Sequence, residues 1–178
     1  MFLNVKVTMH WITIPLVILA YLVCIFIGAM VILVKYKKCV RAFESGDFDY
    51  VLRHEKLLFH FRKSPIPTAS LHYMLAVSYF NRNDDNAFVK HMDLVSIEEL
   101  QWGKDYWLAI YAVAHSDFAQ CDSLQEKLLI DSMDSQKTMA YEVLTLAYKH
   151  QKEGYILSYE EREKIASSKH DRIKQMFS

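Results

Sequence analysis

Two groups of side chains in the sequence are of types that could do chemistry, and the first contains His54, Glu55 and His60. Two histidines that share one helix face four residues apart, with an adjacent glutamate, bind zinc in metalloproteases. Here the histidines are six residues apart, which turns a helix by about 600° and directs the two rings apart. We therefore interpret both as half-exposed surface histidines.

The second group is Cys121 with its neighbour Asp122 and with His115, which could supply a thiol nucleophile and its base. Cys121 also fits a small, buried position of the helical repeat described below, so we interpret it as an inert core thiol. The sequence contains no glycine-rich phosphate loop, no G-x-S-x-G motif and no C-x-x-C motif. It predicts no enzyme, no metal site and no cofactor.

The element that must position the rest of the chain is residues 11–34, which hold 24 residues without a charge. A helix of that length reaches roughly 36 Å, enough to cross a hydrocarbon core of about 30 Å. A cleaved signal peptide has a shorter apolar region and a small-x-small cleavage site, which is missing here. A soluble core helix would seldom be apolar on every face. We predict a transmembrane helix at 11–34, preceded by a flank at 1–10.

Basic residues are unequally distributed around this helix. Lys35, Lys37, Lys38 and Arg41 follow it at once, whereas Lys6 is the one basic side chain before it. Because the more basic end of a span stays in the cytoplasm, the pattern predicts a single-pass protein with a cytoplasmic C-terminal domain. Small residues at four-residue steps would let a second helix approach the span closely: Ala20, Cys24 and Gly28.

The remainder, residues 35–178, is long enough for one domain with a core. The chain has 21 basic and 21 acidic residues, a balance that argues against nucleic-acid binding. Its three cysteines are odd in number and one lies in the span, so they form no disulfide framework. This cysteine usage agrees with a reducing cytosol.

Apolar residues of this domain recur at three- and four-residue steps, and glycine and proline are scarce, so we predict an all-α fold. The first helix continues the membrane helix, and its pair ends near Lys63. Further helix pairs are expected at 68–95, at 104–130, and at 135–152 with 158–175. Ser158 and Glu161 have the spacing of a capping box. The charged last helix is expected to be a polar outer cap.

Turns with a common composition separate the helices. F-E-S-G-D-F-D-Y-V-L at 43–52 has a close counterpart around Asp117-Phe118 and a weaker one at Asn83-Asp84-Asp85. Glycine or asparagine can take the left-handed conformation that ends a helix, and aspartate then accepts from free N–H groups of the next one. A two-helix unit with a period in the thirties is typical of a solenoid of helical hairpins.

Three predicted first helices share a further pattern, in which a large apolar residue is followed by a small one: Leu75-Ala76 with Tyr79, Leu108-Ala109, and Leu144-Thr145 with Tyr148. After Leu108-Ala109, the small residue Cys121 follows in the second helix of that unit. The leucines are 33 and 36 residues apart (108 − 75 and 144 − 108). On these residues, the stretch 39–174 resembles the tetratricopeptide repeat (TPR) family, although the consensus tryptophan is absent. The resemblance implies an α-solenoid of about three to four TPR-like hairpins.

In that family the first helices of successive units line a concave groove. The resemblance implies that the groove residues here include Tyr73, Val77, Phe80, Asn81, Tyr106, Ile110, Val113 and Ala114. Such an apolar, aromatic surface suits an amphipathic helix or an extended hydrophobic peptide. The alternative is that these residues pack against a neighbouring helix, such as the C-terminal one bending back.

Two functions follow as expectations. The first is a membrane-anchored adaptor or scaffold that binds a protein partner at the cytoplasmic membrane face through the groove. The second is an accessory or assembly subunit of a larger integral membrane complex, or a homodimer, held by its transmembrane helix.

Overall fold

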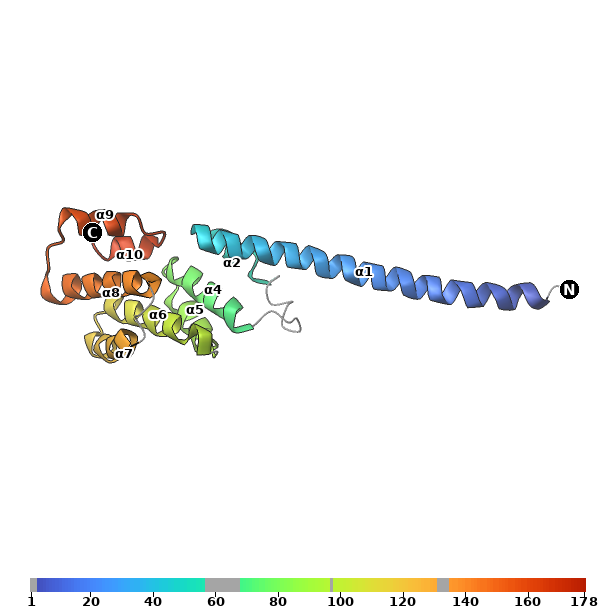
Figure 1. Ribbon diagram of the computed structural model, residues 1–178, viewed down its shortest axis with the longest axis horizontal. Helices are drawn as coiled ribbons and strands as arrows, with labels where there is room; N and C mark the ends of the chain where they lie inside the picture. Colours follow the sequence, from blue (N-terminus) through green and yellow to red (C-terminus); the bar gives the residue numbers. More distant parts are fainter. Residues whose placement is uncertain (1–2, 57–67, 97, 131–134) are drawn as a thin grey trace. The chain divides into compact units, whose positions relative to one another are not determined.

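The computed structural model describes residues 3–56, 68–96, 98–130 and 135–178 (Figure 1). In these ranges all regular structure is helical, which confirms the all-α prediction for the described residues. The helices are α1 (Leu3–Ser45), α2 (Phe48–Arg53), α4 (Thr68–Phe80), α5 (Asp85–Asp93), the 3₁₀ helix η2 (Glu98–Leu100), α6 (Gln101–Ala114), α7 (Phe118–Ile130), α8 (Ser135–Glu153), α9 (Tyr159–Ala166) and α10 (Asp171–Gln175).

The chain forms two compact units, Met1–Cys39 and Val40–Ser178, whereas the sequence placed a boundary after Val34. Helix α1 is long and apolar enough to cross a membrane. It runs without a break from Leu3 to Ser45. Its described apolar side chains from Ile14 to Val34 are largely exposed.

The second unit, called the helical domain below, is built from consecutive helices that pack on each other. Helix α4 packs against α5 and α2, and α6 packs against α7 and α8. The predicted pairs at 68–95 and 104–130 correspond to α4 with α5 and to α6 with α7. The predicted end of the first pair near Lys63 lies outside the described residues.

Three turns of similar geometry connect helices of the domain. Gly46, Asn83 and Ser116 have positive φ angles of 86°, 58° and 59°. The residue after each is an aspartate whose side chain accepts from the backbone N–H three positions on, at 3.0, 3.0 and 3.1 Å for Asp47, Asp84 and Asp117 respectively. The predicted role of these aspartates is confirmed, whereas the left-handed serine was not expected.

Side chains from α2, α4, α5, α6, α7, α8 and α10 meet in one core. Its largest fully buried members include Phe80, Phe88, Met92, Ile110, Leu128, Leu144 and Ile173. Gly103 lets α4 and α6 approach closely, because a Cβ at this position would lie 2.9 Å from the Tyr73 hydroxyl oxygen. The core therefore depends on one small residue in the first turn of α6.

The last part of the chain differs from the prediction of one charged helix at 158–175. The capping box is confirmed, because Ser158 and Glu161 bond each other's backbone N–H groups at the start of α9. The helix then ends at Ala166, and a second, five-residue helix, α10, begins at Asp171. Ile173 on α10 belongs to the core, so this segment is not simply a polar outer cap.

Candidate functional site

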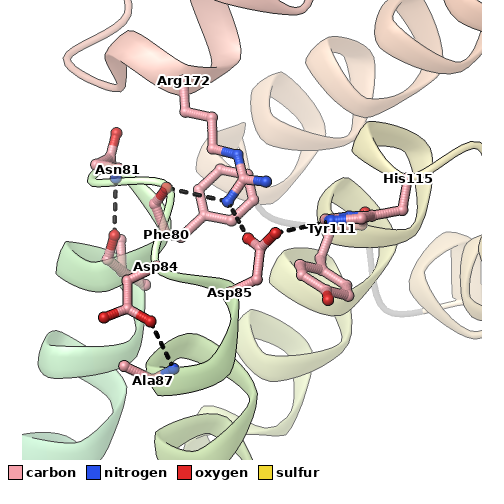
Figure 2. Close-up of polar contacts among 9 residues, drawn as sticks. Phe80, Asn81, Asp84, Asp85, Ala87, Tyr111, His115 and Arg172 are labelled. Carbon is pink, nitrogen blue, oxygen red and sulfur yellow. Dashed lines mark hydrogen bonds and ion pairs between the residues drawn. The ribbon is translucent and has the colours of Figure 1, made fainter.

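Helix α10 carries Arg172 to the end of α4 and the start of α5 (Figure 2). Its Nη1 donates to the backbone oxygen of Phe80 at 3.3 Å and to Oδ1 of Asp85 at 2.5 Å. The guanidinium carbon lies 4.3 Å from the centre of the Phe80 ring. The Arg172 side chain is only 11% exposed, and this shielding strengthens both the cation–π contact and the ion pair.

Asp85 also contacts the end of α6, because its other carboxylate oxygen, Oδ2, lies 2.8 Å from Nε2 of His115. Burial by itself would raise the pKa of Asp85. The hydrogen bonds and charges of Arg172 and His115 outweigh burial and hold the pKa of this carboxyl below its ordinary value. One ionised carboxylate thus connects α5, α6 and α10.

His170, just before α10, lies between two aromatic rings. It stacks on Phe48 with centroids 5.3 Å apart and meets Trp107 edge-on at 4.7 Å. Its Nδ1 accepts a hydrogen bond of 3.1 Å from the side-chain amide of Asn81. Burial, assisted by the charge of Lys169, lowers the pKa of His170 to about 3. The ring is therefore neutral at physiological pH, as its acceptor role requires.

Further contacts hold the rest of this segment. Lys169 donates to the backbone oxygens of Phe43 and Glu44 at 3.4 and 3.1 Å. Ile173 and Met176 are buried in the core cluster. We call residues Lys169–Met176 the α10 segment. We call the residues that receive it the α10-binding face: Phe48, Phe80, Asn81, Asp85 and Trp107.

The eight predicted groove residues divide by burial. Five are buried in the domain: Val77, Phe80, Tyr106, Ile110 and Val113. Tyr73, Asn81 and Ala114 are half-buried. The Tyr73 hydroxyl accepts from Nε1 of Trp107 at 3.0 Å, and burial raises the pKa of Tyr73. The five buried residues pack against other helices of the domain, which is the alternative that the sequence left open. A role of the eight residues in partner binding stays a prediction.

The small-residue face of α1 is open in the described chain. Ala20 and Cys24 are exposed, and a Cβ added at Gly28 would meet no atom within 4 Å. The contact of this face with a second helix stays a prediction.

The side chains that suggested chemistry in the sequence do not converge on a reactive centre among the described residues. His54 is half-buried and bonds the Tyr50 backbone oxygen, and His60 lies outside the described residues. Cys121 is buried, and burial, together with nearby Asp122, raises its pKa to about 12. His115 pairs with Asp85. In the described ranges no group of three His, Cys, Asp or Glu side chains is arranged to hold a metal.

A second polar cluster, which sequence reasoning missed, lies between α4, α5 and the residues after α2. The Tyr79 hydroxyl donates to Glu55 at 2.6 Å, and Nδ1 of His72 lies 2.9 Å from Nδ1 of His91. Burial, reinforced by His72, lowers the pKa of His91. Nε2 of His91 also lies 3.6 Å from a carboxylate oxygen of Glu55, so the cluster joins residues up to 36 positions apart (91 − 55) and no local spacing indicated it.

The sequence raised the possibility of a C-terminal helix that bends back onto the groove residues, but it did not indicate the contacts of Arg172 with Phe80 or of His170 with Asn81. Arg172 meets Asp85 and Phe80 across 87 and 92 residues of chain. One local signal was present, because Ile173, Met176 and Phe177 recur at three- and four-residue steps. That pattern indicates an apolar side on this segment, although its many charged residues are typical of a solvated helix.

Comparisons of the chain with protein-family models, with curated proteins and with solved structures found no match.

Proposed function

We propose that the chain is a single-pass, membrane-anchored interaction adaptor, in which a TPR-like helical array binds a peptide or amphipathic helix of a partner protein. Helix α1 would hold the protein in the bilayer, and the helical domain would present its binding face at the cytoplasmic membrane surface. No catalytic step and no cofactor are part of this proposal.

The observation that carries the proposal is the α10-binding face, which holds a short peptide segment through side chains from several helices. Aromatic rings, an amide and a carboxylate converge there on His170 and Arg172. Aromatic surfaces with a few placed polar groups are typical of peptide recognition. A domain that receives one of its own segments in this way has the chemistry to receive a similar segment of another protein.

The recurring turns support a TPR-like array as the scaffold of this face. The left-handed residues Gly46, Asn83 and Ser116 are 37 and 33 positions apart (83 − 46 and 116 − 83). Each precedes an aspartate that caps the following helix, so the two-helix unit is built each time by the same local interactions.

The membrane part of the proposal rests on the length and composition of α1 and on the basic residues after residue 34. Ser123 is exposed on α7, and Ser123→Cys introduces a thiol for sidedness mapping. We expect an impermeant maleimide to label this thiol in lysed cells but not in intact ones. Equal labelling in both would place the domain outside.

Site-specific crosslinking tests partner binding. Ala114→Cys adds a thiol within the predicted groove, and Ala119→Cys adds one to an exposed position of α7. With a photo-crosslinker on each thiol, we expect a discrete adduct with a second protein in membranes from position 114 but not from 119. The same adducts from both positions, or intramolecular products alone, would contradict the adaptor.

The second candidate, a subunit of a larger membrane complex, is favoured by the open small-residue face around Gly28. Gly28→Leu should release the protein from such a complex during electrophoresis in mild detergent. Phe26→Leu is the matched control, because two residues turn a helix by about 200° and place this change on another side. Co-migration unchanged by Gly28→Leu would count against this function.

A further inference from the structure

We propose that the α10-binding face recognises an arginine-bearing segment of the partner, and that the α10 segment is a resident occupant that this partner segment displaces. The inference rests on the proposed function and adds to it the chemistry of the ligand and a means of control. The ligand is a short helical turn with an arginine, an apolar residue directly after it, and an imidazole two residues before it.

The binding site of the Arg172 side chain selects for arginine. A planar guanidinium can lie on the Phe80 ring and donate at the same time to the Phe80 backbone oxygen and to Asp85. A lysine ammonium has no planar face to lie on the ring and is more strongly hydrated, so it would lose most of the ring contact. His115 holds the second oxygen of Asp85, which fixes the carboxylate in the orientation that the guanidinium needs.

The binding sites of His170 and Ile173 determine which other side chains the ligand must carry. His170 lies between the rings of Phe48 and Trp107, and the side-chain amide of Asn81 donates a hydrogen bond to it, so this position favours a flat ring with an acceptor atom. Ile173, directly after Arg172, enters the core and is 1% exposed. A partner segment that displaces the α10 segment must therefore supply an apolar side chain at the same position.

The resident segment is suited to exchange because its own helix is short. Helix α10 has five residues, and isolated helices of that length are not stable in water. Its order thus depends on the contacts with the face. The residues of the face come from α2, α4, α5, α6 and the turn after α4. Of these helices, α4 and α6 contain 13 and 14 residues and pack against other helices of the domain. The segment can leave while the face persists.

A peptide with the sequence of residues 166–178, labelled at its amino end, tests the inference on the full chain in detergent micelles. Arg172→Ala in the protein removes the resident anchor and leaves Phe80 and Asp85 in place. In the unaltered chain the α10 segment occupies the face most of the time, and only the remaining fraction of the protein can bind the peptide. We therefore expect the Arg172→Ala protein to bind the peptide at least about tenfold more tightly than the unaltered chain. Lys174→Ala is the matched control, because Lys174 pairs with Asp171 on its own helix, and it should bind as the unaltered chain does.

Two further arms test the chemistry of recognition. A peptide with alanine in place of its arginine should bind the Arg172→Ala protein at least about tenfold more weakly, and adding Asp85→Asn to the protein should have a similar effect. Binding that is equal with and without the peptide arginine would overturn the inference, as would a folded Arg172→Ala protein that shows no saturable binding.

If Arg172→Ala does not fold, hydrogen exchange on the unaltered chain decides. Saturating peptide should speed exchange of backbone amides in the α10 segment, and unchanged exchange would overturn the inference. The adaptor function can fail separately, because the Ala114→Cys crosslink does not depend on arginine. A partner adduct at position 114 that excess peptide does not reduce would sink the inference alone.

Discussion

The two units of the chain use the same apolar side chains in opposite ways. Leu22 on α1 is 55% exposed and Leu75 on α4 is fully buried, and Ile25 and Ile110 differ in the same manner. In the helical domain, neighbouring helices cover these side chains. In α1 these side chains are exposed, as is typical of a helix surface that contacts lipid or another protein.

The largest expected difference in unfolding free energy is between two leucine truncations, one in each unit. Leu75→Ala should lower the free energy of unfolding of the domain by about 3 kcal/mol, because it leaves a cavity in a packed core. Leu22→Ala should leave that free energy unchanged. Denaturant titration of the full chain in detergent, followed by circular dichroism, measures both. Equal losses would show that the two units do not differ in packing as described.

A glycine in each unit sharpens the comparison. Gly103→Ala places a methyl group 2.9 Å from the Tyr73 hydroxyl, whereas Gly28→Ala meets no atom within 4 Å. Overpacking costs more than the gain in helix propensity, so Gly103→Ala should destabilise the domain by about 1 to 2 kcal/mol. Gly28→Ala should not destabilise it. The same titration applies, and a more stable Gly103→Ala protein would contradict the close approach of Tyr73.

The pH dependence of stability should belong to the helical domain. The ordinary pKa of His170 is 6.5, and burial lowers it to about 3 in the folded chain. Between these values the unfolded chain binds more protons, so the stability present above pH 6.5 is lost as the pH falls toward 3. His91, whose pKa is also lowered, acts in the same direction.

For His170 alone we expect a loss of about 1 kcal/mol in unfolding free energy between about pH 7 and about pH 5.5. His170→Gln should remove this dependence of the unfolding free energy on pH. His54→Gln should retain it, because His54 is a half-buried histidine outside the α10-binding face. Denaturant titration at the two pH values, read by tryptophan fluorescence, gives the slopes. A slope that His170→Gln does not change would show that His170 titrates normally in the folded chain.

The smallest expected effects concern the capping aspartates, which the domain has and which α1 lacks at its described start. Asp84→Ala and Asp117→Ala should each cost about 1 kcal/mol or less, because each frees one backbone N–H of a helix. Asp93→Ala is the matched control, since this exposed residue ends α5. Thermal unfolding of the three variants should show lower midpoints for the first two only.

Local interactions explain which parts of the fold could be predicted from the sequence. The capping aspartates, the Ser158–Glu161 box and the spans of α4 with α5 and of α6 with α7 depend on residues a few positions apart. The α10 segment could not be placed, because its position depends on contacts between Arg172 and residues nearly 90 positions earlier. Its charges indicated a solvated helix, although the spacing of Ile173, Met176 and Phe177 was a local sign of an apolar side.

The candidate groove was harder to predict than the helices that form it. Spacing showed that Val77, Phe80, Ile110 and Val113 share helix faces, but the same spacing describes a core. The structure buries all four. Two polar residues distinguish the α10-binding face. Asn81, just after α4, was among the predicted groove residues, whereas Asp85, at the start of α5, was predicted only as part of a turn.

The central claim is that one long helix holds an otherwise water-facing helical domain at a membrane. Alkaline extraction of membranes that contain the full chain tests it most directly, because high pH strips peripheral proteins and leaves spanning helices in lipid. We predict that the chain stays with the membrane pellet. Recovery of the folded chain in the aqueous supernatant would contradict the account.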